Sequence, residues 1–225
     1  MSLAPPSPPP ARGFFVTFEG GEGAGKSTQI DRLRNRLAAT GREILVTREP
    51  GGSPRAEAIR SIILSGLAKS AGPLAESALF AAARADHVDR VIRPALERGA
   101  VVLCDRFTDS TRVYQGLAGG LEPGILDRLD EAATAGIRPD LTIVIDVPVA
   151  LGSQRARLRR SGRGEGIDRF EGEDAPFHER VRQGFLDLAA SAPGRCVVVD
   201  GSQAIDVVGD AIWAEVSVPR GRKGA

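Results

Sequence analysis

The stretch FFVTFEGGEGAGKST (residues 14–28) decides the fold of this chain. Its first six residues are rich in aromatic and β-branched side chains, which predicts a buried strand over 14–19. A glycine-rich turn follows, and from Lys26 to about Ala39 apolar residues recur at helical spacing. These apolar residues are Ile30, Leu33 and Leu37. A strand that passes through a glycine-rich turn into an amphipathic helix is typical of a phosphate-binding loop.

The turn itself, GGEGAGKS (20–27), matches the pattern G-x-x-x-x-G-K-[ST] in full. In this pattern backbone N–H groups surround a phosphate, and the helix N-terminus adds a favourable partial charge. We expect Lys26 to reach the β- and γ-phosphates of a nucleotide and the Ser27 hydroxyl to bind Mg²⁺. A glycine-rich turn can arise by chance, but the flanking strand and helix argue against chance here. The predicted nucleotide-binding residues are Gly20, Gly21, Glu22, Gly23, Ala24, Gly25, Lys26, Ser27 and Thr28.

Beyond the loop, short β-branched runs alternate with longer helical patterns, which is typical of parallel strands joined by crossover helices. We expect further strands at 43–47, 100–104, 141–147 and 196–200. We expect helices at 54–65, 123–135, 175–190 and 204–215, a long helical region, straight or bent, at 73–98, and a helix from the fourth strand to about Arg160. The predicted fold is therefore α/β, a doubly wound five-stranded parallel sheet.

The length of 225 residues suits one α/β domain, which we place at 13–217. The proline-rich residues 1–12 are predicted to be a disordered lead-in, SGRGEG (161–166) a flexible basic loop, and residues 218–225 a flexible basic tail. The N-terminus lacks the apolar core of a secretory signal, and no apolar stretch approaches the ~20 residues of a membrane span. We therefore expect a cytoplasmic protein without a membrane partner.

The composition adds little about partners. The formal net charge is +1, so no excess of positive charge favours nucleic acid. Arginine outnumbers lysine 27 to 3, which makes any single arginine weak evidence of function. Cys104 and Cys196 lie in the apolar runs VVLC and CVVVD, so we expect core cysteines and not a disulfide or metal pair. His87 and His178 have no Cys or His at ligand spacing and are expected on helix surfaces.

A phosphate-binding loop alone does not separate kinases from GTPase switches, helicases or transport ATPases. Guanine-selective switches usually carry an N/T-K-x-D segment after a later strand, and this sequence has none. A nucleic-acid motor would normally need a larger chain and a basic track. The remaining pattern favours a small phosphotransferase.

Downstream of the loop the chain resembles the bacterial thymidylate kinases, from about residue 14 to about residue 216. The pieces that carry the resemblance are FEGGEGAGKST (18–28), TREPGG (47–52), LFAAAR (79–84), VIRPAL (91–96), DRF (105–107), STRVYQG (110–116) and RPDLTIVIDV (138–147). TREPGG, DRF and YQG in this order are much more specific than the loop. The resemblance implies transfer of the γ-phosphoryl of ATP to dTMP with Mg²⁺, in dTTP synthesis, by a homodimer.

The same resemblance implies an acceptor site. Phe80 would stack on the thymine ring, and Arg84, one turn later, would hydrogen-bond the base edge. Arg48 and Arg106 lie just beyond expected strand ends, where ligands bind in open α/β sheets, and their guanidinium groups could hold the acceptor phosphate. The alternatives are a core aromatic for Phe80 and solvated surface charges for the arginines.

Further residues would surround the sugar and the metal. Ser110, Thr111 and Tyr114 would line the nucleoside pocket, with the Tyr114 ring in the space that a ribose 2′-hydroxyl needs. Glu22 would lie near the acceptor sugar. Asp105 would orient Mg²⁺ or its waters, or align the acceptor phosphate, beside the Ser27 hydroxyl. Glu49 is expected to fix the geometry of its loop, with a role near the metal as the alternative.

Six arginines crowd around SGRGEG, at positions 155, 157, 159, 160, 163 and 169. They are either a solvated helix face or a lid, about residues 155–169, that closes over ATP and delivers an arginine to the transferring phosphoryl. Eukaryotic-type thymidylate kinases carry an arginine inside the loop, where this chain has Gly23, which favours the lid. The predicted catalytic residues are Lys26, Asp105, Arg106, Arg157 and Arg163. A kinase for another nucleoside monophosphate and an ATP-dependent switch without transfer activity remain the alternatives.

Overall fold

The computed structural model describes residues 12–163, 170 and 172–217 of the chain. Five parallel strands form one sheet in the order β2-β3-β1-β4-β5. Their bounds are β1 Phe14–Glu19, β2 Ile44–Arg48, β3 Val101–Asp105, β4 Leu141–Asp146 and β5 Cys196–Asp200. Each strand lies within one residue of its predicted bounds. Because the central strands are covered on both faces, they read as apolar runs in the sequence.

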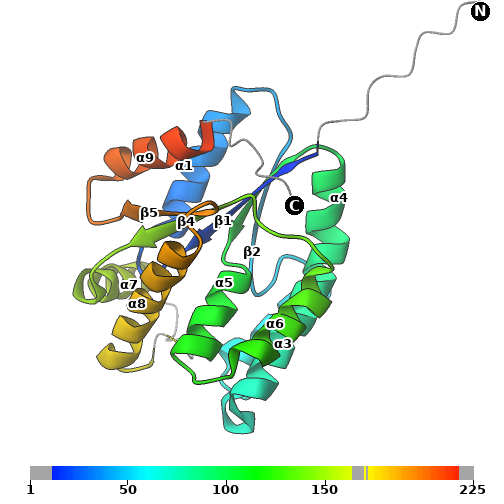
Figure 1. The fold of residues 1–225 in the computed structure, drawn as a ribbon. Helices are drawn as coiled ribbons and strands as arrows, with labels where there is room; N and C mark the ends of the chain where they lie inside the picture. The colour runs from blue at the N-terminus through cyan, green and yellow to red at the C-terminus, as the bar shows by residue number, and fades with distance from the viewer. Residues whose placement is uncertain (1–11, 164–169, 171, 218–225) are drawn as a thin grey trace, which may run out of the picture.

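Helices cover both faces of this sheet, which confirms the predicted fold class (Figure 1). The α-helices are α1 Lys26–Ala38, α2 Pro54–Leu64, α3 Gly72–His87, α4 Arg93–Glu97, α5 Thr108–Thr111, α6 Pro123–Thr134, α7 Val149–Arg163, α8 Ala175–Ser191 and α9 Ile205–Ser217. Short 3-10 or π segments are η1 Lys69–Ala71, η2 Val88–Ile92 and η3 Arg112–Leu117. None of the helices described is both long and apolar enough to cross a membrane.

Alternation along β1 assigns its side chains to two cores. Val16 and Phe18 face α1 and α9, where they pack with residues such as Leu33 and Ile212. Phe15 faces the opposite side and packs with the helical region that contains Val88 and Ile92. Thr17 and Glu19 share the face of Phe15 because successive strand residues alternate. Glu19 is therefore buried beneath the end of the sheet where β1 enters the phosphate loop.

The helical region from 72 to 97 is continuous, as predicted, but a π segment interrupts its α-helical hydrogen bonding. Its middle part, η2, contains a bond from the Arg93 N–H to the Val88 carbonyl, five residues earlier. Pro94 has no N–H to continue the ordinary α-helical ladder, which explains the wider turn just before it. The helical segments η1, α5 and η3 were not predicted from the sequence.

Two predictions about single residues have clear outcomes. Cys104 and Cys196 are buried and free, as expected. The prediction of a surface position for His87 is wrong, because its side chain is fully buried. Thr47 and Glu49 bond its two ring nitrogens, so a polar ring is accommodated in the interior. His178, on α8, is partly exposed.

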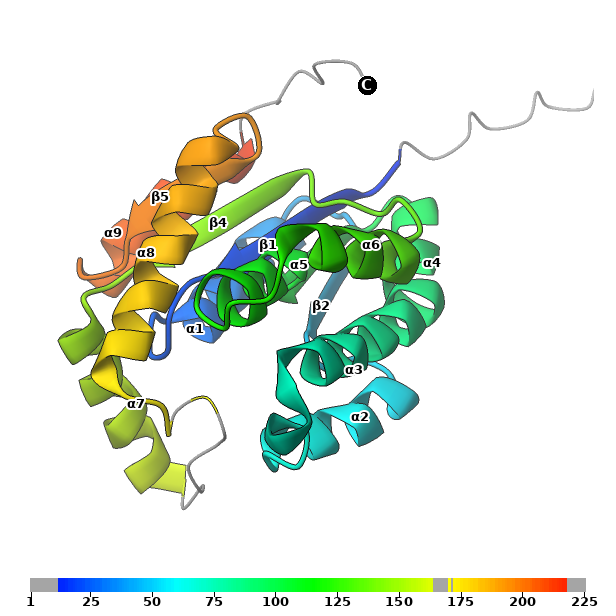
Figure 2. The ribbon, with the colours of Figure 1, turned by 60° about the horizontal axis from the view of Figure 1, so that its bottom comes forward.

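Residues 1–11 of the predicted lead-in and the predicted tail fall outside the described part of the chain, as do residues 164–166 of the predicted loop 161–166. The loop prediction is wrong for residues 161–163, which belong to the last turn of α7. Figure 2 shows α7 and α2 on opposite sides of the sheet end where the phosphate loop lies.

Candidate active site

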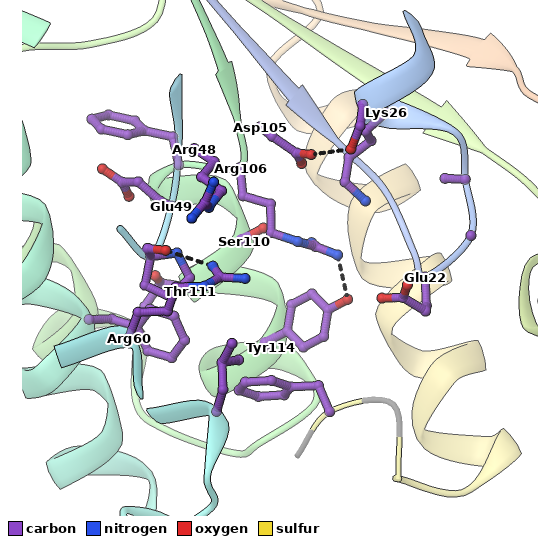
Figure 3. A pocket seen from close by; sticks show the side chains of 18 of the residues that line it. Glu22, Lys26, Arg48, Glu49, Arg60, Asp105, Arg106, Ser110, Thr111 and Tyr114 are labelled. Atoms are coloured by element: carbon purple, nitrogen blue, oxygen red, sulfur yellow. Dashed lines mark hydrogen bonds between the residues drawn. The ribbon is translucent and has the colours of Figure 1, made fainter. Parts of the chain in front are cut away.

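A cavity of about 680 Å³ lies at the carboxyl edge of the sheet. Its wall combines the phosphate loop, the segment after β2, α3, the β3–α5 turn with η3, and α7. In Figure 3, Lys26 and Glu22 lie on one side and Arg48, Arg60 and Thr111 on the other. Arg106 and Tyr114 lie between the two groups. The cavity thus joins the predicted nucleotide site to the predicted acceptor site.

The structure brings most of the predicted site residues into this wall. They are Glu22, Gly23, Ala24, Gly25, Lys26, Ser27, Thr28, Arg48, Phe80, Arg84, Asp105, Arg106, Ser110, Thr111 and Tyr114. Gly20 and Gly21 of the loop and Arg157 are not among the residues that line it. The side chain of Arg163 and residue Arg169 lie outside the described part of the chain.

The loop precedes the first turn of α1, and one of its glycines, Gly23, is closely packed against α7. Gly23 has φ +67°, and a Cβ there would lie 2.0 Å from the carbonyl oxygen of Gly152 in α7. A side chain at this position would push the loop away from α7. The packing therefore explains why this loop carries no arginine of its own at Gly23.

Lys26 is buried at the bottom of the loop. Its ammonium group donates to the carbonyls of Gly20, at 3.2 Å, and Gly21, at 3.1 Å. Burial and the nearby Arg106 cation lower the pKa of Lys26 to about 8, although Asp105, Glu22 and Glu19 oppose the shift. A polyanion in the loop would favour the charged form of this side chain.

Two oxygens where α1 begins and β3 ends could hold a divalent cation. The Ser27 hydroxyl donates to the Asp105 carboxylate at 3.0 Å, where α1 begins and β3 ends (Figure 3). In the described part of the chain no group of three or more His, Cys, Asp or Glu residues surrounds a metal position. Mg²⁺ usually takes one or two protein oxygens and completes its shell with water and substrate phosphates. Ser27 and Asp105 fit that requirement.

Glu22 projects from the loop toward α7. Its carboxylate accepts from Arg159 at 2.7 Å. Burial alone would raise the pKa of Glu22, but Lys26, Arg106 and Arg159 more than offset this effect and lower it to about 2. The carboxylate is therefore ionised and joins the loop to α7.

Arg106, at the turn after β3, is the central cation of the acceptor side. It adopts φ +69°, a conformation that non-glycine residues rarely take and that is often found at functional sites. Its guanidinium donates to the Ser110 hydroxyl at 3.0 Å and to the Tyr114 hydroxyl at 3.2 Å. The same group lies 5.1 Å from the centre of the Tyr114 ring. These contacts hold both the cation and the aromatic ring in fixed positions.

Glu19 supports this turn from below, a role that sequence reasoning missed. Its carboxylate accepts from the Phe107 N–H at 2.8 Å and from the Ser110 hydroxyl at 2.6 Å. Burial, and then the nearby Asp109 charge, raise the pKa of Glu19 to about 7. An acidic residue at the end of an otherwise apolar strand was the available signal.

Arg84 and Phe80 line the cavity from α3. The Phe80 ring is half-buried and lies 6.2 Å from the ring of Phe170. Arg84 is almost fully buried, and its guanidinium donates to three side chains: Glu49 at 2.8 Å, Asp130 at 3.0 Å and Thr111 at 2.9 Å. Burial disfavours its charge, but Glu49 and Asp130 outweigh burial and raise the pKa of Arg84. The predicted role of Glu49 in fixing its loop fits this pairing.

Two arginines come from the end of β2 and from α2. Arg48 is exposed and donates to Glu57 at 3.0 Å. Arg60, which sequence reasoning missed, lines the cavity from α2 and donates to the Pro50 carbonyl at 2.7 Å. No sequence signal set Arg60 apart from the other arginines of the chain. Their side chains add positive charge at the acceptor end.

The α7 arginines point in different directions. Arg159 and Arg160 line the cavity, whereas Arg157 is exposed and does not. Arg155 donates to the Gly201 carbonyl at 2.8 Å. Among the α7 arginines whose side chains the structure describes, Arg159 and Arg160 line the cavity and the predicted Arg157 does not.

Known proteins provide an independent comparison. Residues 18–212 match the family model described as thymidylate kinase. A thymidylate kinase of Nitrobacter hamburgensis is 54% identical over 95% of this chain and 92% of its own length. A thymidylate kinase of Caulobacter vibrioides is 52% identical over 93% of this chain and 98% of its own.

A solved structure agrees with these sequence matches. The crystal structure of thymidylate kinase from Ehrlichia chaffeensis has a TM-score of 0.72 and 31% sequence identity. The similarity covers 92% of this chain and all of the other. With this fold, this cavity and these matches, the chain belongs to the thymidylate kinase family.

Proposed function

We propose that the protein transfers the γ-phosphoryl of ATP to dTMP, with Mg²⁺, and so forms dTDP for dTTP synthesis. One observation carries the proposal: a complete phosphate loop and an arginine-rich aromatic pocket share a single cavity. Two polyanions must meet end to end in such a reaction, and a common cavity allows this. Family membership agrees with this substrate.

On the donor side, the loop N–H groups and Lys26 hold the phosphates of ATP. The oxygens of Ser27 and Asp105 are the protein ligands for Mg²⁺, which when bound offsets phosphate charge. Lys26 adds a positive charge that can move, because its side chain is bound only to two loop carbonyls. Glu22 stays ionised and, through Arg159, keeps the loop close to α7.

On the acceptor side, Arg48 and Arg106 bind the phosphate of dTMP. Phe80 stacks on the base, and Arg84 donates to its edge. A guanidinium has donors only, so it pairs with a carbonyl oxygen of thymine and not with the amino group of cytosine. Ser110, Thr111 and Tyr114 line the sugar, with the Tyr114 ring fixed by Arg106.

The chemistry needs no strong general base, because a phosphate monoester is largely dianionic at neutral pH. Rate enhancement comes from aligning the two nucleotides and from neutralising charge on the transferring group. Lys26, Arg106 and the cavity-facing arginines of α7, Arg159 and Arg160, supply cations for this purpose. Closure of the lid over the cavity would exclude water, which otherwise turns a kinase into an ATPase.

We further propose one kinase domain at 13–217, a homodimer and a cytoplasmic location. The homodimer follows only from the family, whose members are usually dimeric. Sedimentation equilibrium checks it, because a homodimer should have twice the chain mass of 23.7 kDa. The location agrees with the expected supply of ATP and nucleotides.

ADP release across a panel of deoxynucleoside and nucleoside monophosphates tests the activity. We expect dTMP to give the highest kcat/KM, and dCMP, dGMP and AMP to be poor acceptors. A higher kcat/KM for another monophosphate would show that this monophosphate, and not dTMP, is the acceptor. ADP release that does not depend on any acceptor would favour the ATP-dependent switch.

A further inference from the structure

His87 is a buried polar residue that the proposed mechanism does not use. It ends α3, one turn after Arg84, and it is not among the residues that line the cavity. Its side chain is completely buried, and a Cβ at Gly52 would lie 2.4 Å from its Nε2 atom. The ring therefore fits tightly between α3 and the TREPGG segment.

Both ring nitrogens of His87 are bonded. Nδ1 lies 3.1 Å from Oε1 of Glu49, and Nε2 lies 2.7 Å from the hydroxyl of Thr47. A carboxylate only accepts hydrogen bonds, so Nδ1 carries a hydrogen and donates to Glu49. The histidine thus joins the last part of β2 to the carboxylate that follows it.

Glu49, whose position the bond to His87 fixes, also bonds Arg84. Its second oxygen, Oε2, accepts from Nε of Arg84 at 2.8 Å. With one oxygen on His87 and the other on Arg84, the carboxylate has a single orientation. Arg84 and His87 are three residues apart on α3, so both reach Glu49 from the same helix face.

The orientation of the Glu49 carboxylate matters for recognition of the base because it affects which Arg84 N–H groups are available to a ligand. Three of its five N–H groups bond Glu49, Asp130 and Thr111, which leaves two N–H groups for a ligand in the cavity. The direction of those two groups depends on the guanidinium plane. That plane is set by the bond from Nε to Glu49 together with the bonds from the two terminal nitrogens.

We propose that His87 is a positioning residue for base recognition. It acts through Glu49 to fix the plane of the Arg84 guanidinium, so that the free N–H groups meet a carbonyl oxygen on the base edge. This inference rests on the proposed function, and it adds a specificity determinant that does not touch the nucleotide.

The experiment uses two amide replacements that each keep one of the two bonds. In His87→Asn the amide nitrogen takes the place of Nδ1 and still donates to Glu49. In His87→Gln the amide reaches the place of Nε2 and still bonds Thr47, but Glu49 loses its donor. The control is His178→Asn, at the other histidine of the chain, which is partly exposed on α8.

For each variant we would measure KM for dTMP, KM for ATP and the ratio of kcat/KM for dTMP to that for dCMP. For His87→Gln we expect KM for dTMP to rise about tenfold and the ratio to fall about tenfold, the size of one bond to a charged group. His87→Asn should stay within about threefold of wild type in both quantities, because the Glu49 bond is retained. KM for ATP should be unchanged in all three variants.

Equal changes in KM for dTMP and in the dTMP/dCMP ratio for His87→Asn and His87→Gln would overturn the proposal. So would a loss of kcat for both nucleotides with an unchanged dTMP/dCMP ratio, which indicates a structural role. If the His87 variants fail to fold, Thr47→Val and Glu49→Gln replace them. Thr47→Val removes only the bond to Nε2, so the dTMP/dCMP ratio should stay near that of wild type. Glu49→Gln leaves one oxygen that cannot accept from both His87 and Arg84, so the ratio should fall. A lower ratio in Thr47→Val, or an unchanged ratio in Glu49→Gln, would overturn the proposal.

Failure of the proposed function gives a different result. In that case the wild-type protein itself prefers another monophosphate in the acceptor panel. The Asn and Gln variants are then compared on binding of that nucleotide by calorimetry. Weaker binding of that nucleotide by His87→Gln than by His87→Asn would support the role of His87 independently of thymidylate. Equal binding by the two variants would overturn it.

Discussion

The donor and acceptor halves of the cavity are built in opposite ways. The donor half of the wall consists of seven consecutive residues, 22–28, of the phosphate loop and the start of α1. The acceptor half takes side chains from 48, 80–84 and 106–114, which three different strand ends and helices bring together. A local motif needs only its own turn, whereas the distributed pocket needs buried supports such as Glu19 and Glu49.

The buried cations of the two halves also differ in the direction of their pKa shifts. Burial, and then the Arg106 cation, lower the pKa of Lys26 to about 8, although Asp105, Glu22 and Glu19 oppose the shift. Arg106 and Arg84 are also buried, but their neighbours raise both pKa values. For Arg106 the neighbours are Tyr114 and carboxylates such as Glu19, and for Arg84 they are the carboxylates of Glu49 and Asp130. The donor cation can therefore titrate, and the acceptor cations cannot.

The largest expected effect is on the donor half. Lys26→Ala removes the cation that holds the β- and γ-phosphates, and we expect kcat/KM to fall by about 10³-fold or more. Binding of dTMP, measured by calorimetry, should change little, because the acceptor half is assembled independently. Circular dichroism would verify that the variant is folded. Turnover near the wild-type level in a folded variant would contradict the kinase assignment.

The next largest expected effect is a loss of kcat when arginines of α7, which faces the donor half, are replaced. At Arg159, Arg160 or both, replacement by Ala should lower kcat by about 10²-fold with a much smaller change in KM. Arg157→Ala is the matched control and should stay within about twofold, because its side chain is exposed outside the cavity. A larger effect at Arg157 than at the other two would restore the catalytic role that the sequence indicated for it.

Tyr114 tests whether the acceptor half selects the sugar. Tyr114→Ala should raise kcat/KM for the ribo analogue of thymidylate relative to dTMP by about tenfold, because the ring no longer fills the space near C2′. Tyr114→Phe keeps the ring and loses only the bond to Arg106, so it should keep the deoxy preference.

A constant deoxy/ribo ratio in Tyr114→Ala, with both activities reduced, would make Tyr114 a packing residue. Glu22 would then be the next candidate for sugar selection. The affinity for ATP serves as the control and should not change in either Tyr114 variant, because the donor half has its own contacts.

The smallest expected effect is a pH dependence confined to the donor half. As pH rises through about 8, Lys26 loses its proton and its attraction to phosphate, so kcat/KM for ATP should fall several-fold. Lys26→Arg keeps its charge in this range, and its profile should be flat above neutral pH. If kcat/KM of the wild type and of Lys26→Arg fall in parallel as pH rises, a group other than Lys26 causes the pH dependence.

Much of the fold and the donor site could be predicted because the relevant signals are local. The strand bounds follow from apolar runs, and the loop follows from a pattern whose chemistry resides in its backbone. By contrast, the surface position predicted for His87 was wrong, since a histidine alone does not reveal that Thr47 and Glu49 will meet it.

The sequence by itself determined the parallel sheet, the phosphate loop and the family, because these depend on periodicity and on contiguous motifs. Only the tertiary structure decided which arginines reach the cavity, and it selected Arg159 and Arg160 on α7. It also decided that Glu19 supports the Arg106 turn and that Glu49 links His87 to Arg84. The physical reason is that these roles depend on side-chain direction and on partners distant in sequence, which no local pattern of residues specifies.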